Sequence, residues 1–170
     1  MNITIEKITG DKDNDALLDD ESTNQYKEIA IMCDLDGTLA LKHKNRTWYD
    51  ASTCDVDIVN TPVYEVLIQC IEQYHIIFCS GREDKYREQT LKFLNKAFDD
   101  VSFVENHDFS LFMRATDDFR KDSIVKHEIY YRDIYNNYNV SFVLDDRSQV
   151  VNMWRDACGL TCFQVAEGNF

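Results

Sequence analysis

The sequence has few of the features that mark secreted, membrane-spanning or nucleic-acid-coating proteins. No stretch approaches the roughly 18 to 20 uncharged apolar residues that span a bilayer. The first ten residues lack the apolar core of a secretory signal, so we expect a cytoplasmic protein with no membrane contact. Lys and Arg number 18 against 31 Asp and Glu, and the net charge of -13 argues against a broad nucleic-acid-binding surface.

Proline and glycine are also scarce, with one and five residues in a chain of 170. They leave no candidate for an internal linker, and the length suits one domain. Residues 11–28 hold seven acidic residues against two lysines. Segments of this composition stay disordered because they bury too little apolar surface. We therefore expect an acidic, flexible arm over residues 1–28 and one folded domain over residues 29–170.

The six cysteines form no C-x-x-C pair, and several lie inside apolar runs. Cys158 and Cys162 are the closest candidates for a zinc site, but no second pair accompanies them and the four histidines lie far apart. We therefore expect reduced, buried thiols.

Apolar patterning alternates between short continuous runs and helical spacing. The runs predict strands at 28–34, 75–80, 101–104, 140–146 and 160–165. The helical spacing predicts helices at 61–74, 84–97, 122–136 and 148–158. Residues 105–120 show no clear pattern. This alternation favours an α/β fold with a mostly parallel sheet covered by helices on both faces, and ligands then bind beyond the carboxyl ends of the strands.

Three of the predicted strands end in polar groups. These are Asp34 and Asp36 after the first, Ser80, Gly81 and Arg82 after the second, and Asp145, Asp146 and Arg147 after the run that begins at Val140. The ends of parallel strands converge, and four carboxylates brought together repel one another unless a hard cation joins them. Each acid pair alone would be explained as the cap of a turn. Two such pairs in one alternating fold favour a Mg²⁺ site.

The segment Asp34-Leu35-Asp36-Gly37-Thr38-Leu39 resembles the first signature of haloacid dehalogenase (HAD) superfamily phosphatases. Ser80, Lys126 and the Asp145-Asp146 pair follow in the order of the three remaining signatures. The resemblance covers residues 29–165 and implies a Rossmann-like, three-layer HAD fold. It also implies that Asp34 is the nucleophile that attacks phosphorus and that Asp36 is the general acid and base.

Within that superfamily the chain looks most similar to the 3′-phosphatase domains of phage polynucleotide kinases. This closer likeness rests on DLDGTLAL, SGRED, RKDSIVKHEIY and the final stretch from DDRSQVVNMWR to GLTCFQVAEGNF. It implies a Mg²⁺-dependent polynucleotide 3′-phosphatase that acts on RNA or DNA ends, with 2′,3′-cyclic phosphate as a further candidate substrate. It also suggests a phage or viral origin, which would place the enzyme in the host cytoplasm.

The resemblance assigns roles to the remaining candidates. Mg²⁺ would be held by Asp34, Asp145, Asp146 and the main-chain carbonyl of Asp36. The phosphoryl oxygens would be held by Ser80, Gly81, Lys126 and the backbone around Thr38. Arg82 and Arg46 would contact the substrate. Asp122 stands one helical turn before Lys126 and would orient it, although a surface salt bridge of little value is the alternative.

The segment that follows the nucleophile is short. Only about 24 residues separate Gly37 from Thr61, too few for a folded cap domain. We therefore expect an open site that admits a polymer end. Trp48 and Tyr49 in this segment could stack on a terminal base, or could equally be packing anchors.

Alternative functions remain open on the sequence. The same chemistry could serve a phosphatase acting on nucleotides or phosphoproteins. A catalytically silent end-binding module is disfavoured because Asp34 and Asp36 are both present. No G-x-x-x-x-G-K-[ST] phosphate loop occurs, so we do not expect this chain to phosphorylate 5′ ends. A separate kinase or ligase is a candidate partner.

Overall fold

The computed structural model describes residues 27–47 and 49–168. The predicted acidic arm over residues 1–28 lies almost entirely outside this range, as does Trp48. Within the described part, no helix is both long and apolar enough to cross a membrane. All six cysteines are free thiols; four are buried as predicted, whereas Cys70 and Cys158 are half-buried.

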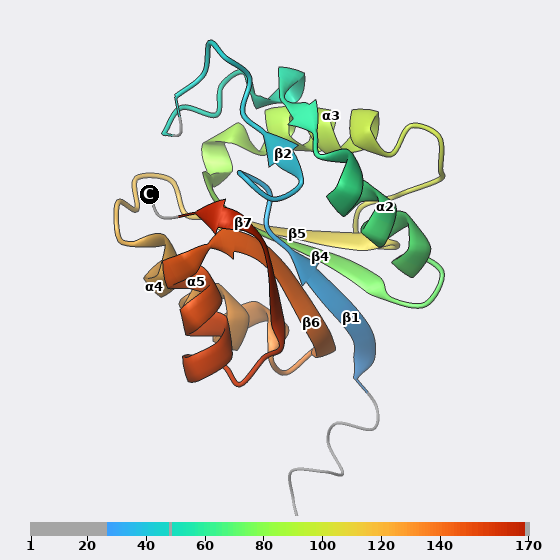
Figure 1. The fold of residues 1–170 in the computed structure, drawn as a ribbon, viewed down its shortest axis with the longest axis vertical. Helices are drawn as coiled ribbons and strands as arrows, with labels where there is room; N and C mark the ends of the chain where they lie inside the picture. Colours follow the sequence, from blue (N-terminus) through green and yellow to red (C-terminus); the bar gives the residue numbers. More distant parts are fainter. Residues whose placement is uncertain (1–26, 48, 169–170) are drawn as a thin grey trace, which may run out of the picture.

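A five-stranded parallel sheet forms the centre of the molecule (Figure 1), in the order β5-β4-β1-β6-β7. Its strands are β1 (Glu28–Cys33), β4 (His75–Glu83), β5 (Phe109–Arg114), β6 (Tyr138–Arg147) and β7 (Cys162–Gly168). Each pairing is parallel because a helical crossover separates the strands in sequence. A small antiparallel pair, β2 (Ala40–Leu41) and β3 (Ile58–Val59), lies between β1 and the first helix.

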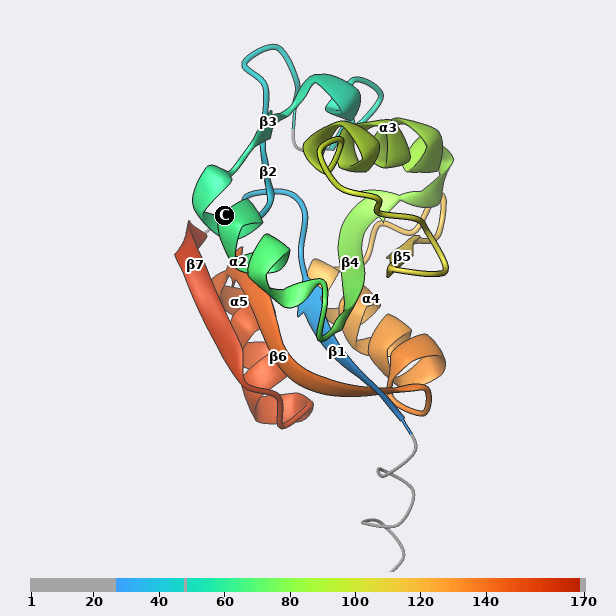
Figure 2. The ribbon, with the colours of Figure 1, turned by 90° about the vertical axis from the view of Figure 1, so that its right-hand side faces the viewer.

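Helices cover both faces of the sheet, as the two ribbon views show (Figure 2). One face carries α2 (Thr61–Cys70) and α3 (Arg87–Ala97), and the other carries α4 (Asp122–Ile129) and α5 (Ser148–Asn152). A hydrophobic core lies on each face of the sheet, and strand β1 contributes side chains to both. Ile31 packs toward α2 and α3, and Met32 packs toward α4 and α5. Side chains of a strand alternate between faces, so a strand buried on both sides must be apolar throughout. The predicted three-layer α/β fold is confirmed.

Short 3₁₀ and π turns extend these elements. The 3₁₀ turns are Cys54–Val56 and Asp84–Tyr86, and the π turns are Tyr130–Ile134 after α4 and Met153–Ala157 after α5. With their π turns, α4 and α5 reach close to the predicted ends at residues 136 and 158. Among its described residues, the segment between β1 and α2 holds only β2, β3 and one 3₁₀ turn, so the expectation of no large cap domain is confirmed.

The prediction of a strand at residues 101–104 is wrong. That stretch is a loop in which Phe103 stacks on Phe98 and Phe109, and the strand is β5, Phe109–Arg114. Val101 and Phe103 are partly buried against the core beneath α2 and α3, whereas Val104 is 54% exposed, so the apolar run at 101–104 indicated only partial burial. In β5 the polar Ser110 and Arg114 interrupt the apolar run, which is why the pattern there was unclear.

Candidate active site

The predicted site residues converge at the carboxyl ends of β1, β4 and β6. Asp34 follows β1, Ser80 and Arg82 lie near the end of β4, and Asp145 and Asp146 lie near the end of β6. Strand order reverses around β1, and this is where open α/β sheets bind their ligands. The Asp34 N–H donates to the Leu144 carbonyl at 2.9 Å, which ties the loop after β1 to β6.

Gly37 allows the loop after β1 to approach the acid pair closely. Its φ is +92°, and a Cβ atom there would lie 2.3 Å from Asp146 Oδ2. The next residue, Thr38, donates from Oγ1 to Asp146 Oδ1 at 3.3 Å. Its carbonyl accepts from Asn60 Nδ2 at 2.7 Å. A larger side chain at position 37 would therefore be strained and would also displace Asp146.

Three buried carboxylates form a cluster that suits a metal ion. Asp34, Asp145 and Asp146 each offer a ligand atom, and these atoms lie within 4.8 Å of one another. An all-carboxylate donor set in a buried position suits a hard cation such as Mg²⁺. The structure thus brings together three of the four predicted ligands. The side chain of the fourth, Asp36, lies outside the cluster, and only its main-chain carbonyl was expected to serve.

Lys126 enters the cluster from α4. Its Nζ atom donates to Asp34 Oδ1 at 2.6 Å and to Asp145 Oδ2 at 3.0 Å, and it lies 3.6 Å from Asp122 Oδ2. Burial opposes the charge on this amine, but the three carboxylates hold its pKa above the usual value. Lys126 therefore stays positively charged. The partner Asp122 is itself largely buried, so the surface-salt-bridge alternative does not apply.

Burial raises the pKa of the Asp34 carboxyl well above its usual range, against the opposing charge of Lys126. The charges of Asp145, Asp122 and Asp146 add to the rise. A nucleophilic carboxyl must be ionised to attack phosphorus. One lysine does not balance this group of acids, and a bound divalent cation would supply the missing positive charge.

Asp36 faces away from the cluster, toward two buried arginines. Arg82 donates from Nε and NH2 to the two Asp36 oxygens at 2.8 and 2.9 Å, and Arg46 NH2 donates to Oδ1 at 2.5 Å. Both guanidinium groups also bind Asp57, at 2.6 Å from Arg46 and 3.1 Å from Arg82. The predicted substrate contacts Arg46 and Arg82 thus hold an acid pair inside the protein. Only Arg82 also lines the pocket.

This network controls the ionisation of Asp36. Burial would raise the pKa of the carboxyl, but the hydrogen bonds and charges of Arg82 and Arg46 outweigh it and lower the pKa below its usual value. Asp57 was missed by the sequence reasoning. It lies 11 residues beyond Arg46 in an irregular loop, where no periodic pattern marks a buried acid.

The end of β4 is joined to the start of α4 by Arg114, a second residue that the sequence did not reveal. Arg114 donates from Nε to the Gly81 carbonyl at 2.7 Å and from NH2 to Asp122 Oδ1 at 3.1 Å. Gly81 allows this approach, since a Cβ atom there would lie 2.2 Å from Asp122 Oδ1. Ser80 is fully buried, and its Oγ accepts from the Arg82 N–H at 3.2 Å.

Trp154 contacts the site from the hydrophobic core. It lies in the π turn after α5, is buried in the core on the α4 and α5 face, and its indole Nε1 donates to Asp145 Oδ2 at 3.2 Å. That oxygen also accepts from Lys126. Outer hydrogen bonds of this kind fix the orientation of carboxylates that ligate metals.

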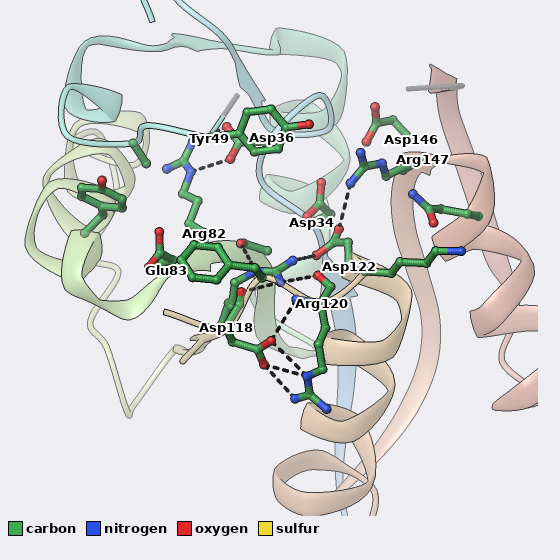
Figure 3. Close-up of a pocket in the computed structure, with 17 residues that line it drawn as sticks. Asp34, Asp36, Tyr49, Arg82, Glu83, Asp118, Arg120, Asp122, Asp146 and Arg147 are labelled. Carbon is green, nitrogen blue, oxygen red and sulfur yellow. Dashed lines mark hydrogen bonds and ion pairs between the residues drawn. The ribbon is translucent and has the colours of Figure 1, made fainter. Parts of the chain in front are cut away.

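A pocket of about 480 Å³ opens over these groups (Figure 3). Asp34, Asp36, Arg82, Asp122 and Asp146 line it, whereas Lys126, Ser80 and Asp145 lie beneath its surface. In the view of Figure 3, Tyr49 stands on one side of Asp34, and Asp118 and Arg120 stand on the other. The buried acids and Lys126 therefore form the floor of the pocket, and the segments after β2 and β5 form its walls.

Because of the acid cluster, we expect the stability of the folded protein to depend on pH and on Mg²⁺. Burial raises the pKa of Asp146 from 3.8 to about 6, with a contribution from the charge of Asp145. The metal-free folded protein then binds more protons than the unfolded chain between these values, so its stability falls as pH rises through this range. We expect Asp146→Asn to stabilise the metal-free protein at pH 7 by about 1 kcal/mol, and the gain to vanish near pH 4.

Thermal unfolding in EDTA and in Mg²⁺ tests this expectation. Mg²⁺ should stabilise the wild type, since it binds the folded state, and should stabilise Asp146→Asn far less. Asparagine keeps the acceptor for Thr38, so this hydrogen bond is retained. A variant less stable than the wild type in EDTA at pH 7 would show that the carboxylates do not repel as inferred.

Comparison with known proteins agrees with this geometry. Residues 28–170 match the family described as the polynucleotide kinase PNKP phosphatase domain. A protein of Autographa californica nuclear polyhedrosis virus, provisionally named a bifunctional polynucleotide kinase/RNA ligase, is 37% identical over 142 residues. That match covers 80% of this chain and 19% of the viral protein.

Two solved structures of a Pnkp1/Rnl/Hen1 RNA repair complex contain a chain that is 46% identical, with a TM-score of 0.76. The match covers 85% of this chain and 44% or 48% of theirs. This chain thus spans less than half the length of these relatives. Since the family match covers residues 28–170, and Asp34, Lys126 and the Asp145-Asp146 pair lie together in the fold, the chain belongs to the family of polynucleotide kinase PNKP phosphatase domains, which are HAD-type.

Proposed function

We propose that the chain is a Mg²⁺-dependent polynucleotide 3′-phosphatase that releases phosphate from RNA ends through an aspartyl-phosphate intermediate. One observation carries the proposal. Asp34 lines an open pocket, and Lys126, which is outside the pocket lining, donates hydrogen bonds to both Asp34 and Asp145. The names of the relatives, an RNA ligase fusion and an RNA repair complex, support RNA as the substrate. They also support a kinase and a ligase as partners of this chain.

The proposed reaction has two displacements. An Asp34 oxygen attacks phosphorus, and the bond from phosphorus to the 3′ oxygen breaks as Asp36 gives that oxygen a proton. A water molecule then attacks the phosphorus of the aspartyl-phosphate, Asp36 takes the proton of the water, and phosphate and free Asp34 are formed. Lys126, charged and 2.6 Å from Asp34, offsets negative charge at the attacked phosphoryl group.

The donor step requires Asp36 to be protonated, although Arg46 and Arg82 lower its pKa in the free protein. A phosphate dianion entering beside Asp36 adds negative charge and competes for Arg82, which lines the pocket. Both effects raise the pKa of Asp36 when the substrate is bound. The arginines would therefore keep the acid ionised, and ready to accept a proton, once the phosphate has moved.

The metal would be held by Asp34, Asp145 and Asp146, whose burial and spacing suit it. When bound, it neutralises charge at the phosphate and orients it for in-line attack. The outer contact from Trp154 and the contact from Thr38 then position the acid pair.

Phosphate release with Mg²⁺ from matched substrates tests the proposal. We expect release from an RNA oligonucleotide with a 3′-phosphate, little or none from the same sequence with a 5′-phosphate, and a lower kcat/KM for a 3′-mononucleotide. A 2′,3′-cyclic end is assayed beside them. Equal release from both ends, or preferential release from a mononucleotide or phosphopeptide, would keep the phosphatase chemistry and reject the polynucleotide 3′ end as its substrate.

A further inference from the structure

Two aromatic side chains on the pocket walls have no packing role in the described part of the chain. Phe119 is 85% exposed and Tyr49 is 89% exposed, the highest values among the large hydrophobic residues there. Both line the pocket that contains Asp34. Single exposed apolar residues are common on protein surfaces, so position alone does not decide their role. The hydrogen bonds that fix the backbone around Phe119 indicate its role.

The loop that carries Phe119 is fixed on both sides of the ring. Arg114 NH1 donates to the carbonyls of Asp118 and Arg120, at 3.0 and 2.7 Å. Arg120 in turn pairs with Asp118 and with Glu128, each at 2.7 Å, as Figure 3 shows for Asp118. Asp117 adopts a φ of 62°, in the left-handed region. A strained and multiply bonded loop thus keeps an apolar ring in water, beside the candidate nucleophile.

The electrostatics of the chain favour an uncharged contact for nucleic acid. The net charge of -13 opposes binding along a phosphate backbone. On the Phe119 wall, the Arg120 guanidinium is already neutralised by its two carboxylate partners. An aromatic ring can hold a nucleobase by stacking without relying on charge, and it does so whatever the base.

We propose that Phe119 is a stacking platform for the terminal nucleobase of the polynucleotide whose 3′-phosphate reaches Asp34, with Tyr49 as a second aromatic contact to the same nucleotide. This inference rests on the proposed function, and it names the part of the substrate that the pocket walls recognise. The pocket volume of about 480 Å³ lies within the range of sites that bind small ligands. The phosphate contacts the floor and the base contacts the walls.

Fluorescence titration measures the contact without turnover. The Asp34→Asn protein is titrated into a 3′-phosphorylated oligonucleotide with 2-aminopurine as its last base, because stacking quenches that base. We expect clear quenching, and about 5- to 150-fold weaker binding when Phe119→Ala is added, the range for loss of one stacked base. Phe119→Trp restores the binding. The matched control is Phe163→Ala, a 55% exposed phenylalanine of β7 outside the pocket lining.

Steady-state kinetics on the otherwise wild-type chain gives a second readout. We expect Phe119→Ala and Tyr49→Ala to raise KM for the 3′-phosphorylated oligonucleotide, with kcat nearly unchanged. The KM for an oligonucleotide that ends in an abasic 3′-phosphorylated sugar should not respond to Phe119→Ala. The rise in KM should also persist at high salt, because stacking is not a charge interaction.

The outcomes separate the two proposals. Release of 3′-phosphate with unchanged KM and quenching in Phe119→Ala would overturn the stacking site and keep the phosphatase. Quenching that depends on Phe119, without release of 3′-phosphate by the wild type, would keep the stacking site and reject the phosphatase. An equal KM rise for the abasic substrate would show that Phe119 does not contact the base.

Discussion

We expect Asp34→Asn to lower kcat for phosphate release from a 3′-phosphorylated oligonucleotide by more than about 1,000-fold, the scale for removal of a covalent nucleophile. An amide oxygen is a poor nucleophile, so the aspartyl-phosphate cannot form. Rapid acid quenching of a reaction with ³²P-labelled 3′-phosphate checks the cause directly. Labelled protein should accumulate transiently in the wild type and be absent in the variant.

The loss of activity is not expected to come from unfolding. In the metal-free protein, burial already holds the pKa of Asp34 high, so a neutral side chain at this position is tolerated. Thermal unfolding in EDTA should therefore give a Tm for Asp34→Asn close to that of the wild type. Asp99→Asn, an exposed acid after α3, is the activity control. Hydrolysis by Asp34→Asn at more than a few per cent of the wild-type rate would show that another group attacks phosphorus.

Local patterns were sufficient for the central strands and for the group of acids at their ends. Ile31 and Met32 lie in a continuous apolar run because they feed two cores, and the Asp pairs follow such runs in β1 and β6. Parallel pairing then brings Asp34 near Asp145 without further information. The HAD resemblance added the roles and the lysine, and the structure places Lys126 in contact with both acids.

Contacts between irregular segments could not be predicted in the same way. The pairing of Arg46 and Arg82 with Asp57 joins two loops and a strand end, and neither spacing nor periodicity encodes it. Arg114 was missed because it lies at the end of β5, a strand that the sequence pattern did not predict since it contains the polar residue Ser110. The hydrogen bond from the Trp154 indole to Asp145 depends on ring orientation, which a helical pattern does not reveal.

Asp57→Asn is expected to lower the free energy of unfolding by about 3 kcal/mol, because it leaves two buried guanidinium groups with a single carboxylate. The side chain of Asp57 is fully buried and binds both Arg46 and Arg82, and it also accepts from the His43 N–H at 2.9 Å. Asparagine keeps the shape but lacks the charge, and its NH₂ group faces guanidinium donors. Urea unfolding checks the value, with Asp99→Asn as the exposed control that should change it by less than about 0.5 kcal/mol.

The same substitution should also alter catalysis, through Asp36. With Asp57 neutral, both arginines act on Asp36 alone, and its pKa falls further below its usual value. Asp36 then carries a proton less often and protonates the 3′ oxygen less effectively. Without that proton the 3′ oxygen must leave as an alkoxide, which is a poor leaving group. We therefore expect Asp57→Asn to lower kcat for a 3′-phosphorylated oligonucleotide by about 10- to 100-fold, and to lower it much less for 4-nitrophenyl phosphate, whose leaving group needs no proton. Equal losses on the two substrates, measured where the variant is fully folded, would show that Asp57 supports the fold of the site without governing the acid.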